Sequence, residues 1–394
     1  MSTFEALSGN EAVATAMRQI NPDVMAAYPI TPQTSTIQRF ADFCADGLVD
    51  TEYVTVESEH SAMSACVGAS AAGSRVMTAT SANGLALMWE VLYIAASNRC
   101  PIVMSLVNRA LSGPINIHCD HADVMGMRDS GWIILMSENG QEAYDNLIQA
   151  VRIAEHPDVL LPVAVCQDGF ITSHSIERIE IYDDAQVKAF VGTYQPRWPL
   201  LDLDAPKTHG AVGFSDYYYE HKRQQVEAIA QAPRVILEVA EEFQSFGRDY
   251  GLFESYRLED ATVAVVVANS TAGTARVVVD RLREEGRKAG LLKLRVFRPF
   301  PARELADALG HLEAVAVMDR SVSIGAMQNA GPLFLELVAA LTLHGVRLPM
   351  VDYVFGLGGR DIVPREIEGV YRELFQMAET GQVRQAVSYL GVRE

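Results

Sequence analysis

Polar residues that could bind or activate a ligand follow four apolar segments in the first half of the chain. Thr31 lies in the turn YPITPQT, Glu59 in VESEHSA, and Ser81 and Asn83 in TSANGLALM, while Arg109 opens a long polar loop. A guanidinium at the mouth of a site could form a bidentate pair with a substrate carboxylate. Ligands of parallel α/β sheets bind at the carboxyl ends of the strands, so these stretches could line one site.

Each of these residues also has a purely structural interpretation. The two prolines of YPITP could simply stiffen a turn, and Ser81 or Asn83 could cap a helix. Glu59 could do no more than stabilise the helix dipole, and Arg109 could be solvated or salt-bridged. Two features favour a functional Glu59: the helix that follows it is rich in small residues, which would let another surface approach closely, and strand alternation places Glu57 on a different face.

The loop after Arg109 mixes histidine and acidic residues, namely His118, Asp120, His121, Asp123, Arg128 and Asp129. This mixture invites a metal-site interpretation, but no recognised ligand spacing occurs, so we predict no metal site in this chain. Loops this long in compact domains are usually functional. We expect a loop that faces the substrate or another subunit, while the role of residues 112–130 stays open.

Apolar strand-like runs alternate with helical patterns along most of the chain, which predicts buried parallel sheets. Strands are expected at 23–30, 51–58, 75–82, 100–108 and 158–168, with helices at 8–20, 59–73, 83–98 and 140–156. A proline-rich extended segment and a long helix at 217–247 interrupt the pattern. It then resumes with strands at 261–270, 288–297 and 314–319 and a helix at 271–286. We therefore predict two doubly wound α/β domains, 1–195 and 259–394, joined by a connector at 196–258.

The composition of the 394-residue chain excludes several classes of protein. A net charge of −18 leaves no basic stripe for nucleic acid. The five cysteines are scattered without a CxxC pair, which argues against a zinc or iron–sulfur site held by this chain alone. The longest apolar runs, such as ATVAVVVA, are too short to span a membrane. With no signal peptide, these features predict a cytoplasmic protein.

Taken together, the motifs resemble those of a known enzyme family. In order and spacing, AAYPITPQT, VESEHSAMSA, TATSANGLALM and VNRALSGPINIHCDHADVM resemble the alpha subunit of pyruvate:ferredoxin oxidoreductase and its 2-oxoacid:acceptor relatives. The similarity continues through AEHPDVLLPVAVCQDGFITSH, DYYYEHKRQQVEAI and RVFRPFP, and so covers nearly the whole chain.

The resemblance implies one subunit of a thiamin diphosphate enzyme that decarboxylates a 2-oxo acid oxidatively to the acyl-CoA. This subunit would supply a pyrimidine-binding domain and a transketolase C-terminal-like domain. A beta subunit would supply the pyrophosphate domain with Mg²⁺ and a [4Fe–4S] cluster, and gamma- and delta-type subunits would carry further clusters and the coenzyme A-facing domain. Consistently, no GDG…N pyrophosphate motif occurs, and QDGF at Gln167 is not one.

The resemblance also implies roles for individual residues. Glu59 matches the glutamate that hydrogen-bonds the aminopyrimidine ring, where a proton-sharing carboxyl stabilises the imino tautomer. Thr31 and Arg109 match the residues that hold the substrate's carboxylate and keto oxygen. The remaining residues expected on the pyrimidine side are Pro29, Ile30, Ser81 and Asn83.

The resemblance does not fix the 2-oxo acid, the acceptor (ferredoxin or NAD) or the stoichiometry. Pyruvate is the family's commonest substrate. Trp89 and Cys100 depart from the pyruvate-type pattern, and Trp89, although expected to pack on its helix, leaves an aromatic substrate such as phenylglyoxylate open. The absence of a second basic residue beside Arg109 disfavours 2-oxoglutarate. Two alternatives remain: a dehydrogenase or decarboxylase component without iron–sulfur partners, and a non-catalytic assembly scaffold. For the second domain, NSTAGTA at Asn269 predicts a capped helix, with subunit contacts as the domain's role.

Overall fold

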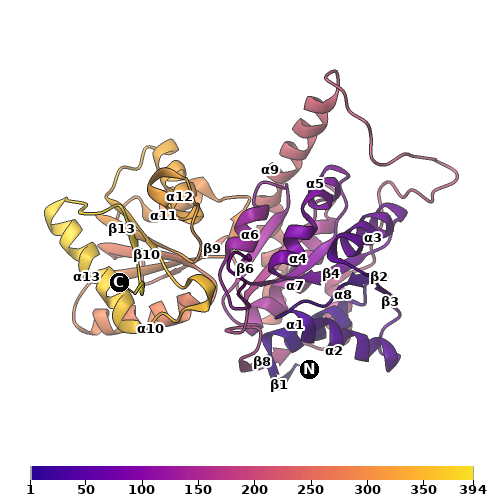
Figure 1. Ribbon diagram of the computed structural model, residues 1–394. Coiled ribbons are helices and arrows are strands. Elements are labelled where there is room, and N and C mark those ends of the chain that lie inside the picture. Colours follow the sequence, from indigo (N-terminus) through magenta and orange to yellow (C-terminus); the bar gives the residue numbers. More distant parts are fainter. Residues whose placement is uncertain (1, 394) are drawn as a thin grey trace.

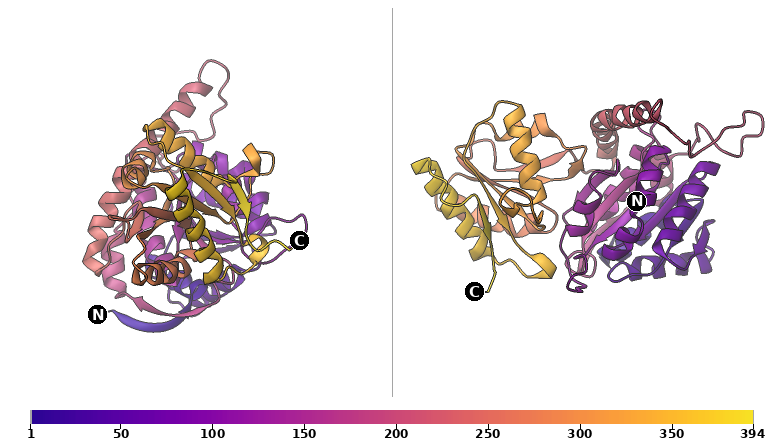
Figure 2. Two further views of the ribbon diagram at one scale, coloured as in Figure 1. Left: turned by 90° about the vertical axis from the view of Figure 1, so that its left-hand side faces the viewer. Right: turned by 45° about the horizontal axis from the view of Figure 1, so that its top comes forward.

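The computed structural model describes residues 2–393 and shows two α/β lobes side by side (Figure 1). A seven-stranded sheet organises the first lobe and a six-stranded sheet the second. The segment between α8 (Asp184–Val191) and α9 (Tyr218–Phe243) projects beyond the first lobe (Figures 1 and 2). Nowhere between residues 2 and 393 does a helix combine the length and the apolar character that crossing a bilayer requires.

The first sheet has the strand order β12-β6-β7-β5-β4-β2-β3, in which every neighbouring pair except β12 with β6 is parallel. Its parallel strands are β2 (Val24–Ala27), β3 (Glu52–Thr55), β4 (Val76–Thr80), β5 (Val103–Asn108), β6 (Ile133–Ser137) and β7 (Val163–Asp168). The chain passes from β2 outward to β3 and then back across β2 to β4. The strand order therefore reverses between β2 and β4, and ligands of open α/β sheets bind at such a reversal.

Alternate residues of each buried strand enter different apolar layers, as the pleat requires. Along β2, Met25 and Ala27 pack in one layer and Ala26 in the other. Helices α1 (Gly9–Ile20), α2 (Thr34–Ala45) and α7 (Gly140–Glu155) cover the first face, and α3 (Glu59–Ala72), α4 (Ala82–Leu87) and α5 (Trp89–Ser97) cover the second. Near-continuous apolar strands are thus explained by burial on both faces.

The second sheet has the order β15-β14-β13-β10-β11-β9, and only β9 is antiparallel to its neighbour. Its strands are β9 (Phe253–Tyr256), β10 (Val263–Ala268), β11 (Ala289–Leu294), β13 (Ala314–Asp319), β14 (Met350–Val354) and β15 (Val387–Tyr389). Helices α10 (Thr271–Glu284) and α13 (Pro364–Thr380) pack on one face, and α11 (Ala302–Leu309) and α12 (Pro332–Leu343) on the other. The predicted α/β class with two mainly parallel sheets is confirmed.

The strand predicted at 288–297 is wrong as one element. It divides into β11 and β12 (Val296–Arg298), and β12 leaves the second sheet to pair antiparallel with β6 of the first. Arg295 separates the two strands, and its guanidinium donates to Asn146 Oδ1 at 2.8 Å and Gln149 Oε1 at 3.0 Å on α7. These bonds direct the chain onto the first lobe. β9 lies in the predicted connector but pairs with the second sheet, and β12 lies in the predicted second domain but pairs with the first sheet. The limits 1–195, 196–258 and 259–394 stay a prediction.

Further elements differ from the sequence prediction, and several, such as α2 and β6, were not predicted at all. The helix predicted at 83–98 divides at Met88 into α4 and α5, and the loop after Arg109 contains a short helix, α6 (Ala122–Met127). The chain begins with β1 (Thr3–Ser8), which pairs antiparallel with β8 (Ile176–Ile181). Most residues of β1 are exposed, so the sequence has no alternation of apolar and polar residues that would indicate this strand.

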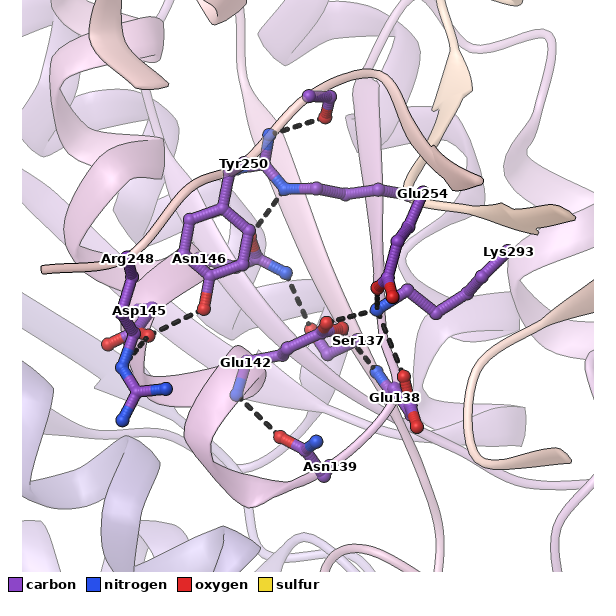
Figure 3. Close-up of polar contacts among 12 residues, drawn as sticks. Ser137, Glu138, Asn139, Glu142, Asp145, Asn146, Arg248, Tyr250, Glu254 and Lys293 are labelled. Carbon is purple, nitrogen blue, oxygen red and sulfur yellow. Dashed lines mark hydrogen bonds and ion pairs between the residues drawn. The ribbon is translucent and has the colours of Figure 1, made fainter. Parts of the chain in front are cut away.

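A buried lysine joins the two lobes (Figure 3). Lys293 on β11 is 4% exposed, and its Nζ contacts Glu138 at 3.0 Å, Glu254 at 2.9 Å and also Glu142. Desolvation alone would lower the pKa of Lys293, but the attraction of Glu142 and Glu138 outweighs it and raises that pKa. The ammonium therefore stays charged and ties the second sheet to β6 and α7 of the first lobe.

We expect Lys293→Met to destabilise the chain strongly, because it leaves buried carboxylates without their cation. Loss of one partner of a buried ion pair costs about 3–5 kcal/mol. Urea denaturation measures the free energy of unfolding, and Lys288→Met is the matched control, since Lys288 is 60% exposed in a loose pair with Asp260. A control effect below ~1 kcal/mol is expected. Equal losses for the two variants would contradict a structural role of the buried lysine.

Candidate active site

The turn after β2 lies at the strand-order reversal and is held by side-chain amides. Gln33 Nε2 donates to the carbonyl of Ala79 on β4 at 2.6 Å, and Asn10 Nδ2 donates to the carbonyl of Pro32 at 2.8 Å. Pro29 and Thr31 are exposed on this turn, and Ile30 is half-buried between them. The turn is therefore fixed to the sheet while its predicted ligand-binding residues remain accessible.

Glu59 is the first residue of α3 and is 7% exposed. Among residues 2–393, no group hydrogen-bonds to its carboxylate, although buried carboxylates are normally paired. Its Oε1 faces Gly84: a Cβ placed on this glycine would lie 2.6 Å from Glu59 Oε1 and 2.6 Å from Thr80 Oγ1. Glycine at position 84 thus lets the Glu59 carboxylate and the Thr80 hydroxyl pack closer to the start of α4 than any side chain would allow.

Glu57 differs from Glu59 in both exposure and partner. Its side chain is exposed and accepts a hydrogen bond from Ser61 Oγ at 2.5 Å. This hydrogen bond lowers the pKa of the Glu57 carboxyl. Strand alternation, from which different faces were predicted, does not explain this difference: residues two apart on a strand share a face, β3 ends at Thr55, and Glu59 already belongs to α3.

Ser81 and Asn83 lie at the start of α4, but neither side chain caps the helix. Ser81 is at the N-cap position, yet its buried Oγ has no partner among the described residues, and the same holds for Thr80 Oγ1. Asn83 Oδ1 instead accepts from the backbone N–H and the hydroxyl of Ser112, both at 3.1 Å. The capping interpretation of TSANG was wrong, and the unpaired Thr80 hydroxyl lies beside Gly84.

Arg109 lies at the end of β5 and reaches the turn after β2. Its Nη1 donates to the carbonyl of Thr31 at 2.9 Å, and its Nε donates to the carbonyl of Asn116 at 2.7 Å. The residue is 6% exposed, and no carboxylate of residues 2–393 lies within 4.0 Å of the guanidinium. A buried cation held only by neutral carbonyls is a ready partner for an anionic ligand.

Asp123 of α6 connects two of these segments, and sequence analysis did not single it out. Its carboxylate accepts from the backbone N–H groups of Ala82 at 3.1 Å and Arg109 at 3.0 Å, and from Asn108 Nδ2 at 2.9 Å. Ala82 has a left-handed φ of 42°, which is strained for a residue with a Cβ. Desolvation raises the pKa of Asp123 to about 6. The sequence indicated a role for Asp123 only through its position in a polar loop.

Three potential metal ligands meet between the lobes, but a cation already lies among them. Atoms of Cys119, His121 and Asp168 lie within 4.8 Å of one another. Arg320 Nη1 donates to Asp168 Oδ2 at 2.8 Å and lies 4.0 Å from Cys119 Sγ. The guanidinium thus takes the position that a metal ion would need.

The chain matches two family models that together span most of its length. Residues 15–241 match the model described as pyruvate flavodoxin/ferredoxin oxidoreductase, thiamine diphosphate-binding, and residues 261–367 match pyruvate:ferredoxin oxidoreductase core domain II. The chain belongs to the pyruvate:ferredoxin oxidoreductase family. The predicted family and function are therefore confirmed: the chain is a subunit of a thiamine diphosphate-dependent 2-oxoacid:ferredoxin oxidoreductase.

Curated relatives agree with this family assignment. Pyruvate synthase subunit PorA of Thermotoga maritima is 56% identical over 99% of this chain and 98% of the relative. Ketoisovalerate oxidoreductase subunit VorA of Pyrococcus horikoshii is 42% identical over 97% of this chain and 96% of the relative. Relatives named for different 2-oxo acids thus match almost the whole length of this chain.

Solved structures share its fold. A 2-oxoglutarate:ferredoxin oxidoreductase from Magnetococcus marinus aligns with a TM-score of 0.73 at 21% identity, over 95% of this chain and 65% of that chain. A split-gene transketolase aligns with a TM-score of 0.56 at 12% identity, over 95% and 100%. At these identities the similarity concerns architecture alone.

The residues at the reversal fit a thiamine diphosphate pyrimidine. The unpaired Glu59 carboxylate and the free hydroxyl of Thr80 offer polar partners for a nitrogen heterocycle. Trp89, which was expected to pack, is instead 45% exposed at the start of α5 and contacts Tyr93 with ring centroids 5.5 Å apart.

We expect Gly84→Ala to weaken thiamine diphosphate binding at least tenfold, since the added methyl would lie 2.6 Å from Glu59 Oε1 and displace the carboxylate. A fluorescence titration of the purified enzyme measures the dissociation constant. Gly369→Ala on α13 is the matched control, because it is also a helical glycine and its Cβ would meet nothing within 4 Å. Unchanged affinity in the Gly84 variant would place the heterocycle elsewhere.

Proposed function

We propose that this chain supplies the aminopyrimidine side of the cofactor site and the residues that bind the 2-oxo acid. The observation that carries the proposal is the Glu59 carboxylate, buried at the strand-order reversal without a partner among residues 2–393. A carboxylate in this setting needs a hydrogen-bond donor or a proton. A protonated pyrimidine nitrogen would provide either.

The proposed role of Glu59 is to share a proton with the pyrimidine ring. When bound, thiamine diphosphate supplies an electron sink for the decarboxylation of a 2-oxo acid. Glu59 lies at the N-terminus of α3 in a largely water-excluded position, where a proton-sharing carboxyl can favour one tautomer of the ring. Pro29, Ile30, Ser81 and Asn83 would border the ring from the turns after β2 and β4.

Arg109 and Thr31 are the proposed substrate-binding pair. The guanidinium keeps Nη2 without an acceptor among residues 2–393, which leaves donors for the carboxylate of a 2-oxo acid. The Thr31 hydroxyl, on the exposed turn joined to Arg109 through its carbonyl, would bind the keto oxygen. Pyruvate is the proposed 2-oxo acid, because the relative with 56% identity is named a pyruvate synthase subunit.

A partner subunit would complete the site. We propose that a beta subunit supplies the pyrophosphate-binding residues, Mg²⁺ and a [4Fe–4S] cluster, and that gamma- and delta-type subunits and coenzyme A complete the reaction to acetyl-CoA. Exposed apolar residues beside the site support such a partner: Leu87 is 51% exposed, Trp89 45% and Ile94 43%. They belong to α4 and α5, next to α3, which the His60–Glu90 contact at 2.9 Å joins to α5.

Replacement of Glu59 tests the catalytic role. In the complex purified with its partner subunits, Glu59→Ala is expected to lower kcat for pyruvate oxidation by roughly 10²–10⁴, the usual contribution of a positioned proton-transfer group. Glu57→Ala is the control, since Glu57 is exposed two residues away. Activity within twofold of wild type in the Glu59 variant would support the scaffold alternative instead.

Replacement of Arg109 tests substrate binding. Charge-assisted hydrogen bonds contribute ~1.5–3 kcal/mol, so Arg109→Ala should raise the KM for pyruvate roughly 10- to 100-fold. Steady-state kinetics of the same complex measure this effect. Arg303→Ala on α11 is the control, because that side chain is 79% exposed. An unchanged KM in the Arg109 variant would remove the proposed substrate contact.

A further inference from the structure

The loop after Arg109 is held by a glycine-rich turn of the second lobe. Asn116 Nδ2 donates to the carbonyl of Gly358 at 3.1 Å, and the N–H of Gly358 donates to Asp120 Oδ2 at 3.2 Å. The carbonyl and the N–H of Gly358 thus bind the two ends of the loop segment 116–120. Contacts between residues more than two hundred positions apart in the sequence therefore set the path of this loop.

Glycine is required at this turn for two independent reasons. Gly358 and Gly359 have left-handed φ values of +62° and +81°, which side chains disfavour. A Cβ at Gly358 would also lie 2.6 Å from Asn116 Nδ2, and a Cβ at Gly359 would lie 2.3 Å from the Cβ of His118. The turn therefore lies so close to the loop that a side chain at Gly358 or Gly359 would clash with Asn116 or His118.

The contact continues to the proposed substrate-binding group. Asn116 binds Gly358 through its side chain, while its own carbonyl accepts from Arg109 Nε at 2.7 Å. Arg109 Nη1 in turn donates to the carbonyl of Thr31 at 2.9 Å. A single residue therefore links the second lobe to the guanidinium, and that guanidinium has no carboxylate partner within 4.0 Å in residues 2–393 to orient it.

We propose that Asn116 is a positioning residue: with the Gly358–Gly359 turn, it orients Arg109 for the carboxylate of the 2-oxo acid. This inference rests on the proposed role of Arg109. The second lobe then acts on substrate binding, in addition to any subunit contacts, because it fixes one of the two carbonyls that direct the guanidinium. A misdirected guanidinium would weaken substrate binding more than the chemical step.

The test uses the complex purified with its partner subunits and pyruvate as substrate. Asn116→Ala removes the bond to Gly358, and Gly359→Ala pushes on His118, so each variant should raise the KM for pyruvate about tenfold while kcat changes less than threefold. Gly345→Ala is the matched control, since its φ of +75° imposes similar backbone strain and its Cβ would meet nothing within 4 Å. Its KM should remain at the wild-type value.

A double variant separates positioning from a general structural role. If Asn116 acts through Arg109, the Arg109→Ala/Asn116→Ala variant should have the KM of Arg109→Ala alone. Further additive loss, or a KM rise of the same size in Gly345→Ala, would overturn the inference. So would a KM within twofold of wild type in both Asn116→Ala and Gly359→Ala. If Arg109→Ala itself leaves KM unchanged, the proposed function fails rather than this inference alone.

Discussion

The structure depends on one buried carboxylate, that of Asp168 at the end of β7. It accepts hydrogen bonds from Arg320 Nη1 and Asn269 Nδ2, both at 2.8 Å, and pairs with the His121 imidazole at 2.8 Å. Desolvation would raise its pKa, but His121 and Arg320 outweigh that effect and lower it, so the group is an anion. Because Asn269 and Arg320 follow the central strands of the second sheet, the carboxyl ends of both sheets meet at this charge. Separating the lobes would leave the buried Asp168 carboxylate without Arg320 and Asn269, at a large cost in free energy. This cost fixes the lobes relative to each other.

The same junction continues into the active site through a chain of amides. Asn269 Nδ2 also lies 3.4 Å from Asn108 Oδ1, and Asn108 Nδ2 donates to Asp123. Asp123 then accepts from the backbone of Arg109 and Ala82, which begin two of the segments that border the proposed site. Positions proposed to bind ligand and positions that join the lobes thus share one hydrogen-bonded network, and a change in lobe packing would be transmitted to both segments.

Local patterns in the sequence predicted most of this arrangement, whereas its long-range contacts were not predictable. Apolar runs and helical spacing predicted β2 to β5, β7, β10, β11 and β13 and the strand-to-turn position of Glu59. They also predicted the meeting of the segments that contain Thr31 and Arg109. Each of these features depends on neighbours in sequence and on one rule about sheet edges. The transfer of β12 to the first sheet depends instead on Arg295 meeting α7, nearly 150 positions earlier. The contact of Asn116 with Gly358 likewise pairs residues that no periodicity relates.

Two buried charged groups at the site lack a partner, which lowers the stability of the folded chain but suits the binding of a ligand. The buried charges of Lys293, Arg320 and Asp168 are paired, yet Glu59 has no donor and Arg109 has no carboxylate among residues 2–393. Each would destabilise an isolated chain relative to an apolar or paired replacement. An anionic 2-oxo acid would compensate the cation, and a pyrimidine nitrogen would compensate the carboxylate. Ligand binding would then provide the partners that Glu59 and Arg109 lack in the folded chain. Unpaired buried groups of this kind are expected at functional sites.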